Sequence, residues 1–491
     1  MNLVGIDLLA KAPLAEGDVF LGGRWLPAAD GRTYPVHDPA TGDPVREVSA
    51  AGPEDARAAI GAAQEAATGW RATPPRRRSE ILHAAFALMR EHTDALARLI
   101  VLENGKAYRD AVAEVGYAAE FFRWFAEEAV RVGSAFGDAP AGGYRHVVRK
   151  HPVGVTAFVT PWNFPAAMAT RKIAPALAAG CPVLLKPAPQ TPLTALAIAA
   201  LLTEAGLPDG LLNVLPTDRA AEVVGVWLGD DRVRKFSFTG STATGRTLLA
   251  QAAANVVNVT MELGGNAPFV VCADADVDAA VHGAMDAKMR GGGEVCIAAN
   301  RFYVHTDVAA EFTRKFGAAM AAVRTGPGLA DGVTLGPMID QTAVARIRDL
   351  VADAVARGAR IAVQGEVPDG PGHFHPATVL VDVPDDARVL HEEVFGPVAP
   401  ITTFTDEDEM VARANATVHG LASYVYSRDV GRALRLAERL ETGMVGVNRG
   451  LLSDPAAPFG GVKQSGLGRE GGREGIEAFL ETQYIALDWP L

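Results

Sequence analysis

The chain has 491 residues, 49% of them hydrophobic and 21% charged, which is enough apolar sequence for two or more buried cores. Its 46 basic and 58 acidic residues leave a formal net charge of −12, which repels nucleic acid and anionic lipid, so we expect neither as a partner. The three cysteines, at positions 181, 272 and 296, are too few and too scattered for a disulfide framework or a zinc site, and they fit a reducing cytoplasm.

The first half of the chain begins with a helical region. Residues 1–11 lack the basic leader of a secretory signal, and no apolar stretch reaches the roughly 20 residues that a membrane helix needs. Between residues 53 and 131, Pro53-Glu-Asp begins one alanine-rich run, and Ser79-Glu-Ile-Leu begins another with apolar positions three and four residues apart. We therefore predict a layer of amphipathic helices there.

From about residue 150, short apolar strands alternate with helical segments, a pattern typical of a parallel, doubly wound sheet. The first series has predicted strands at 155–159, 183–186, 212–215, 235–238 and 258–261, and helices at 166–178, 192–205, 219–228 and 244–255. A second series after Gly264-Gly265 has strands at 269–272, 301–305, 378–381 and 423–426, and helices at 276–290, 307–323, 341–357 and 428–440. We place a domain boundary at this glycine pair.

Two further segments alternate polar and apolar residues and are predicted strands. They are Tyr144–His151 and Tyr484–Asp488, which lie far apart in the sequence. They pair either with each other or with another subunit.

The turn after the first strand of the parallel series is a candidate functional site. In Thr160-Pro-Trp-Asn-Phe-Pro165, Asn163 lies at the carboxyl end of the strand, where ligands collect in open α/β sheets. Its amide could donate to an oxygen that becomes negative during attack on a carbonyl; the alternative is a rigid turn in which Trp162 only packs. Lys186 ends the next strand and could reach a ribose hydroxyl or a phosphate, or be a solvated charge.

A second candidate segment, Phe238-Thr-Gly-Ser-Thr-Ala-Thr-Gly245, runs from a strand into a helix, where backbone N–H groups can bind phosphate. It is not a good P-loop, because Arg246 occupies the lysine position and no acidic metal ligand ends a strand nearby. Thr242 replaces the second glycine of the dinucleotide pattern, so a plain strand-to-helix turn remains an alternative.

Cys296 and Glu262 are the candidate nucleophile and base, 34 residues apart (296 − 262). A thiolate adds readily to a carbonyl carbon, and a carboxylate can take a proton from the thiol or from water. If Cys296 were the only signal in the sequence, a buried structural cysteine would be the simpler interpretation.

Seven motifs in one order resemble the aldehyde dehydrogenase superfamily across nearly the whole chain. They are Trp162-Asn-Phe-Pro, Leu185-Lys-Pro-Ala, Phe238-Thr-Gly-Ser-Thr, Met261-Glu-Leu-Gly-Gly, Cys296, Glu393-Val-Phe-Gly-Pro397 and Pro458-Phe-Gly-Gly-Val-Lys-Gln-Ser-Gly466. Ala169-Thr-Arg-Lys172 and Gly443-Met-Val-Gly-Val-Asn448 look most similar to the succinate-semialdehyde dehydrogenases.

The resemblance implies an α/β fold with a Rossmann-like coenzyme domain, an α/β catalytic domain and a small β oligomerisation arm. It assigns residues 1–131 and 151–263 to the coenzyme domain, 264–470 to the catalytic domain, and 132–150 with 471–491 to the arm. It also implies a homo-oligomer, either a dimer or a tetramer.

The resemblance implies a role for each catalytic residue. Cys296 would form a thiohemiacetal with the aldehyde, while Asn163 and the Cys296 backbone N–H stabilise the oxyanion. After hydride transfer to nicotinamide, Glu262 would activate the water that hydrolyses the thioester and releases the carboxylic acid. No metal is implied.

Coenzyme contacts are implied for a larger set of residues. Glu393 would bind the nicotinamide ribose, Phe395 would pack beside the ring, and Lys186 would bind the adenosine ribose. The remaining implied coenzyme-site residues are Trp162, Pro189, Gly225, Phe238, Gly240, Ser241, Gly245 and Leu263. Because Pro189 stands where NAD-specific relatives often have a glutamate that repels a 2′-phosphate, we expect NADP or NAD, with NADP favoured.

For the substrate, the residues corresponding to a carboxylate-binding set are Arg171, Arg290 and Ser453. They predict oxidation of succinate semialdehyde; glutarate semialdehyde or a broad range of aldehydes is the alternative. The arginines could instead make structural ion pairs.

The loop before the nucleophile departs from the family, which usually has Asn and Gln there. Here it is Gly291-Gly-Gly-Glu294-Val295, and we expect Glu294 to raise the pKa of the thiol. A non-catalytic scaffold of this fold and a thiol hydrolase therefore remain alternatives.

Overall fold

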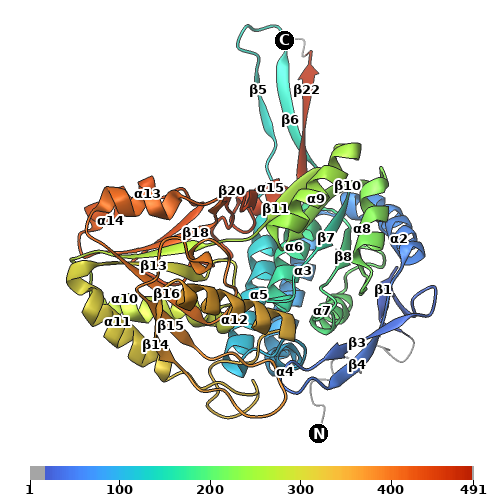
Figure 1. The fold of residues 1–491 in the computed structure, drawn as a ribbon. Helices are drawn as coiled ribbons and strands as arrows, with labels where there is room; N and C mark the ends of the chain where they lie inside the picture. The colour runs from blue at the N-terminus through green and yellow to red at the C-terminus, as the bar shows by residue number, and fades with distance from the viewer. Residues whose placement is uncertain (1–16, 489–491) are drawn as a thin grey trace.

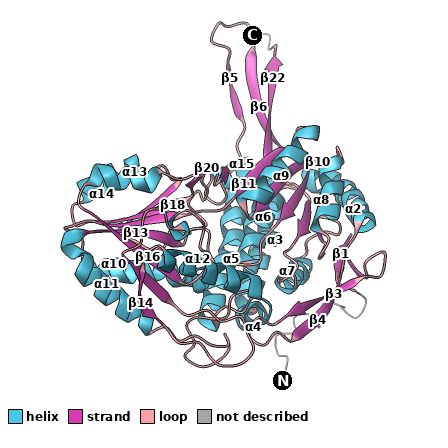
Figure 2. Ribbon diagram, viewed as in Figure 1, coloured by secondary structure: helices cyan, strands magenta, loops and turns pink. Residues whose placement is uncertain are grey.

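The computed structural model describes residues 17–488, and it has two large sheets flanked by helices and a projecting third sheet (Figures 1 and 2). The predicted α/β class is confirmed. Residues 1–16 and 489–491 lie outside the described residues, and so does the segment 1–11, which is predicted not to be a secretory signal. Within 17–488, no helix is both long enough and apolar enough to cross a membrane.

The predicted helical layer consists of four helices. They are α2 (Pro53–Ala72), α3 (Pro75–Glu91), α4 (Thr93–Asn104) and α5 (Tyr108–Ala129). Helix α3 begins at Pro75, four residues before the predicted start at Ser79, because a proline fits the first helical turn, where its missing N–H has no partner to lose.

The first large sheet has the strand order β2-β1-β9-β8-β7-β10-β11-β21. Strands β7 to β11 run parallel, as predicted, whereas β1 and β21 join antiparallel to them. The strands are β1 (Val19–Leu21), β2 (Arg24–Leu26), β7 (Val155–Val159), β8 (Val183–Lys186), β9 (Leu212–Val214), β10 (Val233–Thr239), β11 (Asn258–Glu262) and β21 (Gly466–Leu467). Their helices are α6 (Pro165–Ala179), α7 (Leu193–Glu204), α8 (Ala220–Gly229) and α9 (Thr242–Ala252).

Helix α6 lies at the centre of the molecule, and all of its residues are buried. It begins with Pro165 at its first position and ends at Gly180, whose φ of 102° is a conformation that glycine adopts without steric cost. The alanine-rich sequence between these residues lets α5 and the sheet pack closely against it. The burial fixes the position of every polar side chain that α6 carries.

The second large sheet has the order β14-β15-β16-β13-β12-β18-β19 and is parallel except for its edge strand β14. Its strands are β12 (Ala267–Val271), β13 (Ala299–His305), β14 (Arg360–Gln364), β15 (Thr378–Val381), β16 (Val398–Phe404), β18 (Ala422–Tyr426) and β19 (Met444–Val447). Its helices are α10 (Val277–Met289), α11 (Thr306–Ala321), α12 (Gln341–Ala356), α13 (Glu407–Asn415) and α14 (Val430–Arg439). Strand β16 was not predicted, because Pro400 lies inside it and a proline is uncommon in a central strand.

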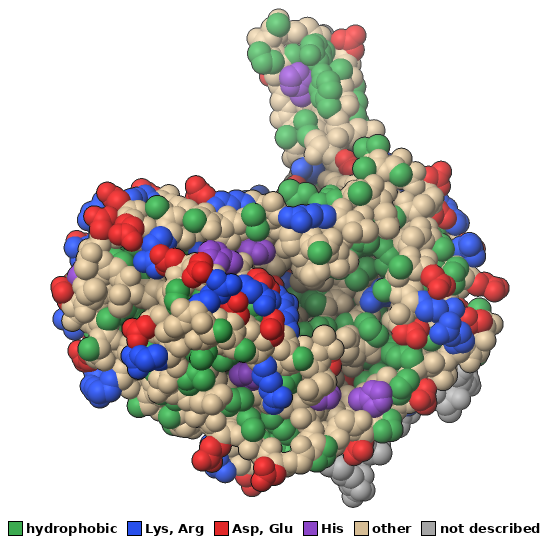
Figure 3. Space-filling view, in the orientation of Figure 1, with side chains coloured by type: hydrophobic (Ala, Val, Ile, Leu, Met, Phe, Trp, Pro, Cys, Tyr) green, Lys and Arg blue, Asp and Glu red, His purple; other side chains and the backbone are tan. Residues whose placement is uncertain are grey.

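The third sheet stands out from the body of the molecule (Figures 1 and 3). It consists of β5 (Ala135–Asp138), β6 (Arg145–Pro152) and β22 (Leu480–Leu487). Of the two predicted pairings, the structure shows the one within the chain, with β22 antiparallel to β6 and Tyr484 opposite Val148. Phe136 is 60% exposed on this sheet and Tyr484 is 54% exposed.

The smaller elements connect these layers. They are β3 (Thr33–His37), β4 (Pro44–Ser49), β17 (His419–Gly420), β20 (Val462–Lys463), α15 (Glu474–Glu477) and the 3₁₀ turns η1 (Ala253–Asn255), η2 (Arg290–Gly293) and η3 (Arg388–Leu390). The turn η2 contains the three glycines that precede Cys296.

Candidate active site

Cys296 lines a cavity of about 240 Å³ at the carboxyl ends of β7, β10 and β11. These three strands are parallel neighbours, so the residues that follow them meet at one edge of the sheet. The predicted residues that line the cavity are Trp162, Asn163, Gly240, Ser241, Glu262, Leu263, Cys296, Glu393 and Phe395.

The Cys296 thiol is half-buried, and its pKa is raised to about 12. Burial is the main cause; the nearby carboxyls of Glu393 and Glu262 raise it further, while Arg171 lowers it. The predicted direction is confirmed, but the predicted cause is wrong. The Glu294 carboxyl accepts the backbone N–H of Ile339 and is not among the groups that shift the thiol.

Asn163 is held beside Cys296 by contacts on both its backbone and its side chain. Its Nδ2 donates to the carbonyl oxygen of Glu294 at 2.8 Å, and its backbone oxygen accepts Lys106 Nζ at 2.7 Å. One amide hydrogen of Nδ2 is therefore used by the loop, which leaves the second for an incoming oxygen.

Glu262 ends β11 with a buried carboxyl whose two oxygens have no hydrogen-bond partner among residues 17–488. Burial raises its pKa well above the ordinary value, and repulsion by Glu470 adds to the rise. Burial also acts on Glu470, but Lys172 and Arg171 outweigh it and lower the pKa of that carboxyl. Glu262 therefore keeps its proton to a higher pH than an ordinary glutamate, whereas Glu470 loses its proton more readily.

The two predicted carboxylate-binding arginines lie in different environments around a small recess that adjoins Cys296. Arg171 is buried on α6, and its Nε lies 2.8 Å from Glu470 Oε2, so it makes the kind of structural ion pair considered as the alternative. Arg290 lies over the Phe164 ring, and its Nη1 donates to Ser453 Oγ at 3.4 Å. Arg290 makes no ion pair within the described part of the chain.

Close packing shapes the strand-to-helix turn that was predicted to bind phosphate. A Cβ at Gly240 would lie 2.4 Å from the Phe238 ring, and a Cβ at Gly245 would lie 2.5 Å from a Leu263 methyl. Both positions therefore need glycine. Ser241 caps α9 by accepting the N–H of Thr244 at 3.2 Å.

The opposite wall of the cavity carries Glu393 and Phe395. Glu393 Oε1 accepts the N–H of Gly265 at 3.1 Å, and burial raises the pKa of this carboxyl to about 7. The Phe395 ring meets Trp162 edge to face at 5.4 Å, and Phe395 has a φ of 50°, which is uncommon for a residue other than glycine.

Five of the predicted coenzyme residues do not line this cavity. Phe238 and Gly245 pack behind Gly240 and Leu263, which do line it. Lys186 is buried at the end of β8, where burial lowers its pKa to about 8. Pro189 lines a separate cavity of about 380 Å³. Gly225 is exposed on α8, with no other atom near the position of a Cβ.

A sequence profile described as "Aldehyde dehydrogenase family" matches residues 25–485. The chain belongs to the aldehyde dehydrogenase family. It is 54% identical over 438 residues to a succinate-semialdehyde dehydrogenase of Paenarthrobacter nicotinovorans. The alignment covers 89% of this chain and 97% of that protein. The predicted family and enzyme class are confirmed.

Other relatives of this aldehyde dehydrogenase differ in their named substrate. Two relatives from Pseudomonas putida are each 49% identical to this chain, and each alignment covers 98% of it. One is a 3-sulfolactaldehyde dehydrogenase, of which the alignment covers 98%. The other is a glutarate-semialdehyde dehydrogenase, of which the alignment covers 99%. A solved structure described as an NADP-dependent enzyme of Escherichia coli superposes with a TM-score of 0.95 at 47% identity, over 96% of this chain and 98% of the other.

Several residues of the enzyme's site were not predicted. Glu470 was missed, although the adjacent cations Arg171 and Lys172 on an apolar helix signal a buried anion. Tyr117 and Phe459 were missed because aromatic residues that line a recess look in sequence like ordinary core residues. Arg346, which donates to the carbonyl of Glu393 at 2.9 Å, had no sequence signal.

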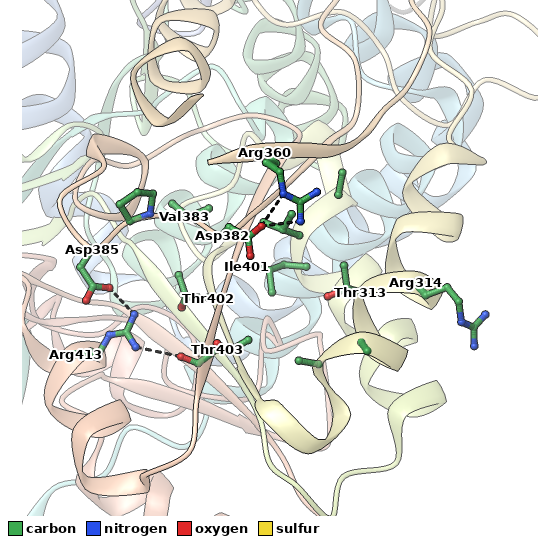
Figure 4. Close-up of a pocket in the computed structure, with 15 residues that line it drawn as sticks. Thr313, Arg314, Arg360, Asp382, Val383, Asp385, Ile401, Thr402, Thr403 and Arg413 are labelled. Carbon is green, nitrogen blue, oxygen red and sulfur yellow. Dashed lines mark hydrogen bonds and ion pairs between the residues drawn. The ribbon is translucent and has the colours of Figure 1, made fainter. Parts of the chain in front are cut away.

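A groove of about 660 Å³ between α11 and strands β14 to β16 contains none of the predicted site residues (Figure 4). Its guanidinium groups are largely paired within the protein: Arg360 with Asp382, and Arg413 with Asp385. The cavity at Cys296 is smaller than this groove, but it is the one in which a thiol, an amide donor and a carboxyl meet.

Proposed function

We propose that this enzyme oxidises succinate semialdehyde to succinate, with NADP or NAD as the hydride acceptor. The observation that carries the proposal is the junction at Cys296: the thiol lines both the main cavity and the recess with Arg290 and Ser453. An aldehyde carbon at the thiol would thus have its far end directed toward a cation.

The residues around Cys296 support the chemistry. The thiolate adds to the carbonyl carbon, and the free hydrogen of the Asn163 amide with the Cys296 backbone N–H stabilises the oxygen anion. When bound, the coenzyme accepts the hydride, which leaves a thioester on Cys296. Glu262 then removes a proton from the attacking water, and the Cys296 sulfur leaves as the acid forms.

The residues of the cavity fit the nicotinamide end of a dinucleotide. The buried Thr239 Oγ1 lines the cavity and has no hydrogen-bond partner within residues 17–488, so it is available to a polar ligand. Glu393, Phe395 and Trp162 would hold the nicotinamide end, and Phe238, Leu263, Ser241 and Lys186 would support the other end. The proline at position 189 removes the carboxylate that would repel a 2′-phosphate, which favours NADP. We also propose that Gly225, which is exposed on α8, lies beside the bound coenzyme.

For the substrate, we propose that Arg290 and Ser453 contact the far carboxylate directly. Arg171 would act through its charge, because Glu470 and Met168 occupy its Nε and Nη2. The named substrates of the relatives leave a glutarate semialdehyde or another aldehyde with an anionic end as the second candidate.

We further propose the division into a coenzyme domain (1–131 and 151–263), a catalytic domain (264–470) and an arm (132–150 and 471–491). The exposed aromatic residues of the projecting sheet support a homo-oligomer, because such side chains are usually covered in an assembly. The three cysteines, all unpaired, support a reducing cytoplasm.

The test is a comparison of initial rates of reduced-coenzyme formation with succinate semialdehyde, glutarate semialdehyde and butanal, each with NAD and with NADP. The highest kcat/KM with succinate semialdehyde supports the proposal. Equal values for butanal would reject the carboxylate site, and product formation without any coenzyme would point to a hydrolase.

A further inference from the structure

We propose that Glu294 is a positioning residue for the Cys296 thiol, because it ties the loop before the nucleophile to two neighbouring segments. The proposal rests on the proposed role of Cys296 as the nucleophile.

Glu294 is 5% exposed and contacts the protein on two sides. Its side-chain Oε1 accepts the N–H of Ile339 at 3.2 Å, next to Asp340, which caps α12. Its backbone oxygen accepts Asn163 Nδ2 at 2.8 Å. One residue, two positions before Cys296, thus connects the nucleophile loop to the segment that precedes α12 and to the proposed oxyanion donor.

The loop needs such anchors because it contains three consecutive glycines. Gly291, Gly292 and Gly293 have φ angles of 53°, 68° and 78°, and glycine loses more backbone freedom on ordering than any other residue. The other anchor at the start of the loop is the N–H of Gly291, which donates to Asp110 Oδ2 at 3.1 Å. Between this anchor and Cys296, the side chain of Glu294 makes the contact with Ile339, just before α12.

The contact depends on the charge of Glu294. Burial raises the pKa of its carboxyl to about 8; the Ile339 N–H and Lys106 lower it, and Asp340 raises it. Lys106 is itself paired with Glu114, so it offers little compensation to a second anion. At neutral pH the side chain is therefore a neutral acid, close to glutamine in shape and charge, and above about pH 8 it becomes a buried anion facing Asp340.

The experiment compares Cys296 alkylation by iodoacetamide in the wild-type enzyme, Glu294→Gln and Glu294→Leu, without coenzyme or aldehyde. Mass spectrometry of the Cys296 peptide separates it from the buried Cys181 and Cys272. Glu366→Gln, at an exposed position, is the matched control. The measured quantity is the ratio of the wild-type alkylation rate to the Glu294→Gln alkylation rate. Because the Cys296 thiol titrates in both proteins, its own pH dependence drops out of this ratio.

We expect this ratio to stay constant within about twofold from about pH 6 to about pH 7 and to change at least roughly threefold between about pH 8 and pH 9.5. Glu294→Leu has no side-chain acceptor for the Ile339 N–H. We expect its alkylation rate to differ from those of the wild type and Glu294→Gln at every pH. A flat ratio up to about pH 9.5 would overturn the proposal, and so would a Glu294→Leu rate equal to that of the wild type. If Glu294→Leu does not fold, the ratio with Glu294→Gln still decides. Since alkylation uses no aldehyde, a failed substrate proposal would leave this result unchanged.

Discussion

The amide of Asn163 donates to the carbonyl oxygen of Glu294 at 2.8 Å, so the proposed oxyanion donor and the loop before the proposed nucleophile are held in one hydrogen-bonded unit. Movement of the loop would move the donor with it. Substitutions around Cys296 are therefore of two kinds: some remove a reacting group such as the thiol or the Asn163 amide, and others leave these groups in place but shift their positions.

Asn163→Ala removes the oxyanion donor. We expect kcat to fall roughly 10²- to 10³-fold with a smaller change in KM, because the hydrogen bond strengthens as the oxygen becomes negative. Steady-state kinetics measures both constants. A kcat within about twofold of wild type would remove Asn163 from the catalytic set.

Cys296→Ala is expected to abolish formation of reduced coenzyme while the protein still binds the coenzyme, which calorimetry measures directly. Cys272→Ala is the matched control, because this cysteine is buried directly after β12 and does not line the cavity. Turnover by Cys296→Ala near the wild-type value would disprove the nucleophile assignment.

The raised pKa of Glu262 predicts an alkaline rise in turnover. A carboxyl whose pKa lies above its ordinary value keeps its proton to a higher pH, so the fraction able to act as a base grows as the pH increases through that pKa. We expect Glu262→Gln to retain a single burst of reduced coenzyme and to lose later turnover, because thioester hydrolysis lacks its base. Stopped-flow absorbance measures both phases; unchanged steady-state turnover is the contrary result.

Arg290→Met should impair substrate binding, whereas Arg171→Met should impair folding stability. Arg290 has no ion-pair partner in residues 17–488, so we expect its loss to raise KM for succinate semialdehyde about tenfold or more and to leave butanal unchanged. Loss of Arg171 removes a cation from the buried Glu470, which we expect to cost about 3–5 kcal/mol of folding stability. Thermal denaturation and kinetics of both variants provide the test, and equal effects on stability would contradict it.

Much of this architecture was predictable because local patterns specify it. The alternation of apolar strands and helices predicted the parallel strands β7 to β11, and the cavity residues follow because parallel strands end at one edge. The Arg171–Glu470 pair was not predictable, since it joins residues 299 positions apart (470 − 171). The direction of the Glu294 side chain depends on Ile339, which no local pattern connects to it.

The pairing of β22 with β6 also affects the order in which the molecule can form. Tyr484 lies opposite Val148, 336 residues earlier in the chain (484 − 148). Closing so long a loop has a large entropic cost unless the intervening residues have already collapsed, so β22 should be among the last strands to join. The local hairpin of β5 and β6 would keep one edge of β6 unpaired until then, which exposes newly made chains to edge-to-edge pairing with other copies.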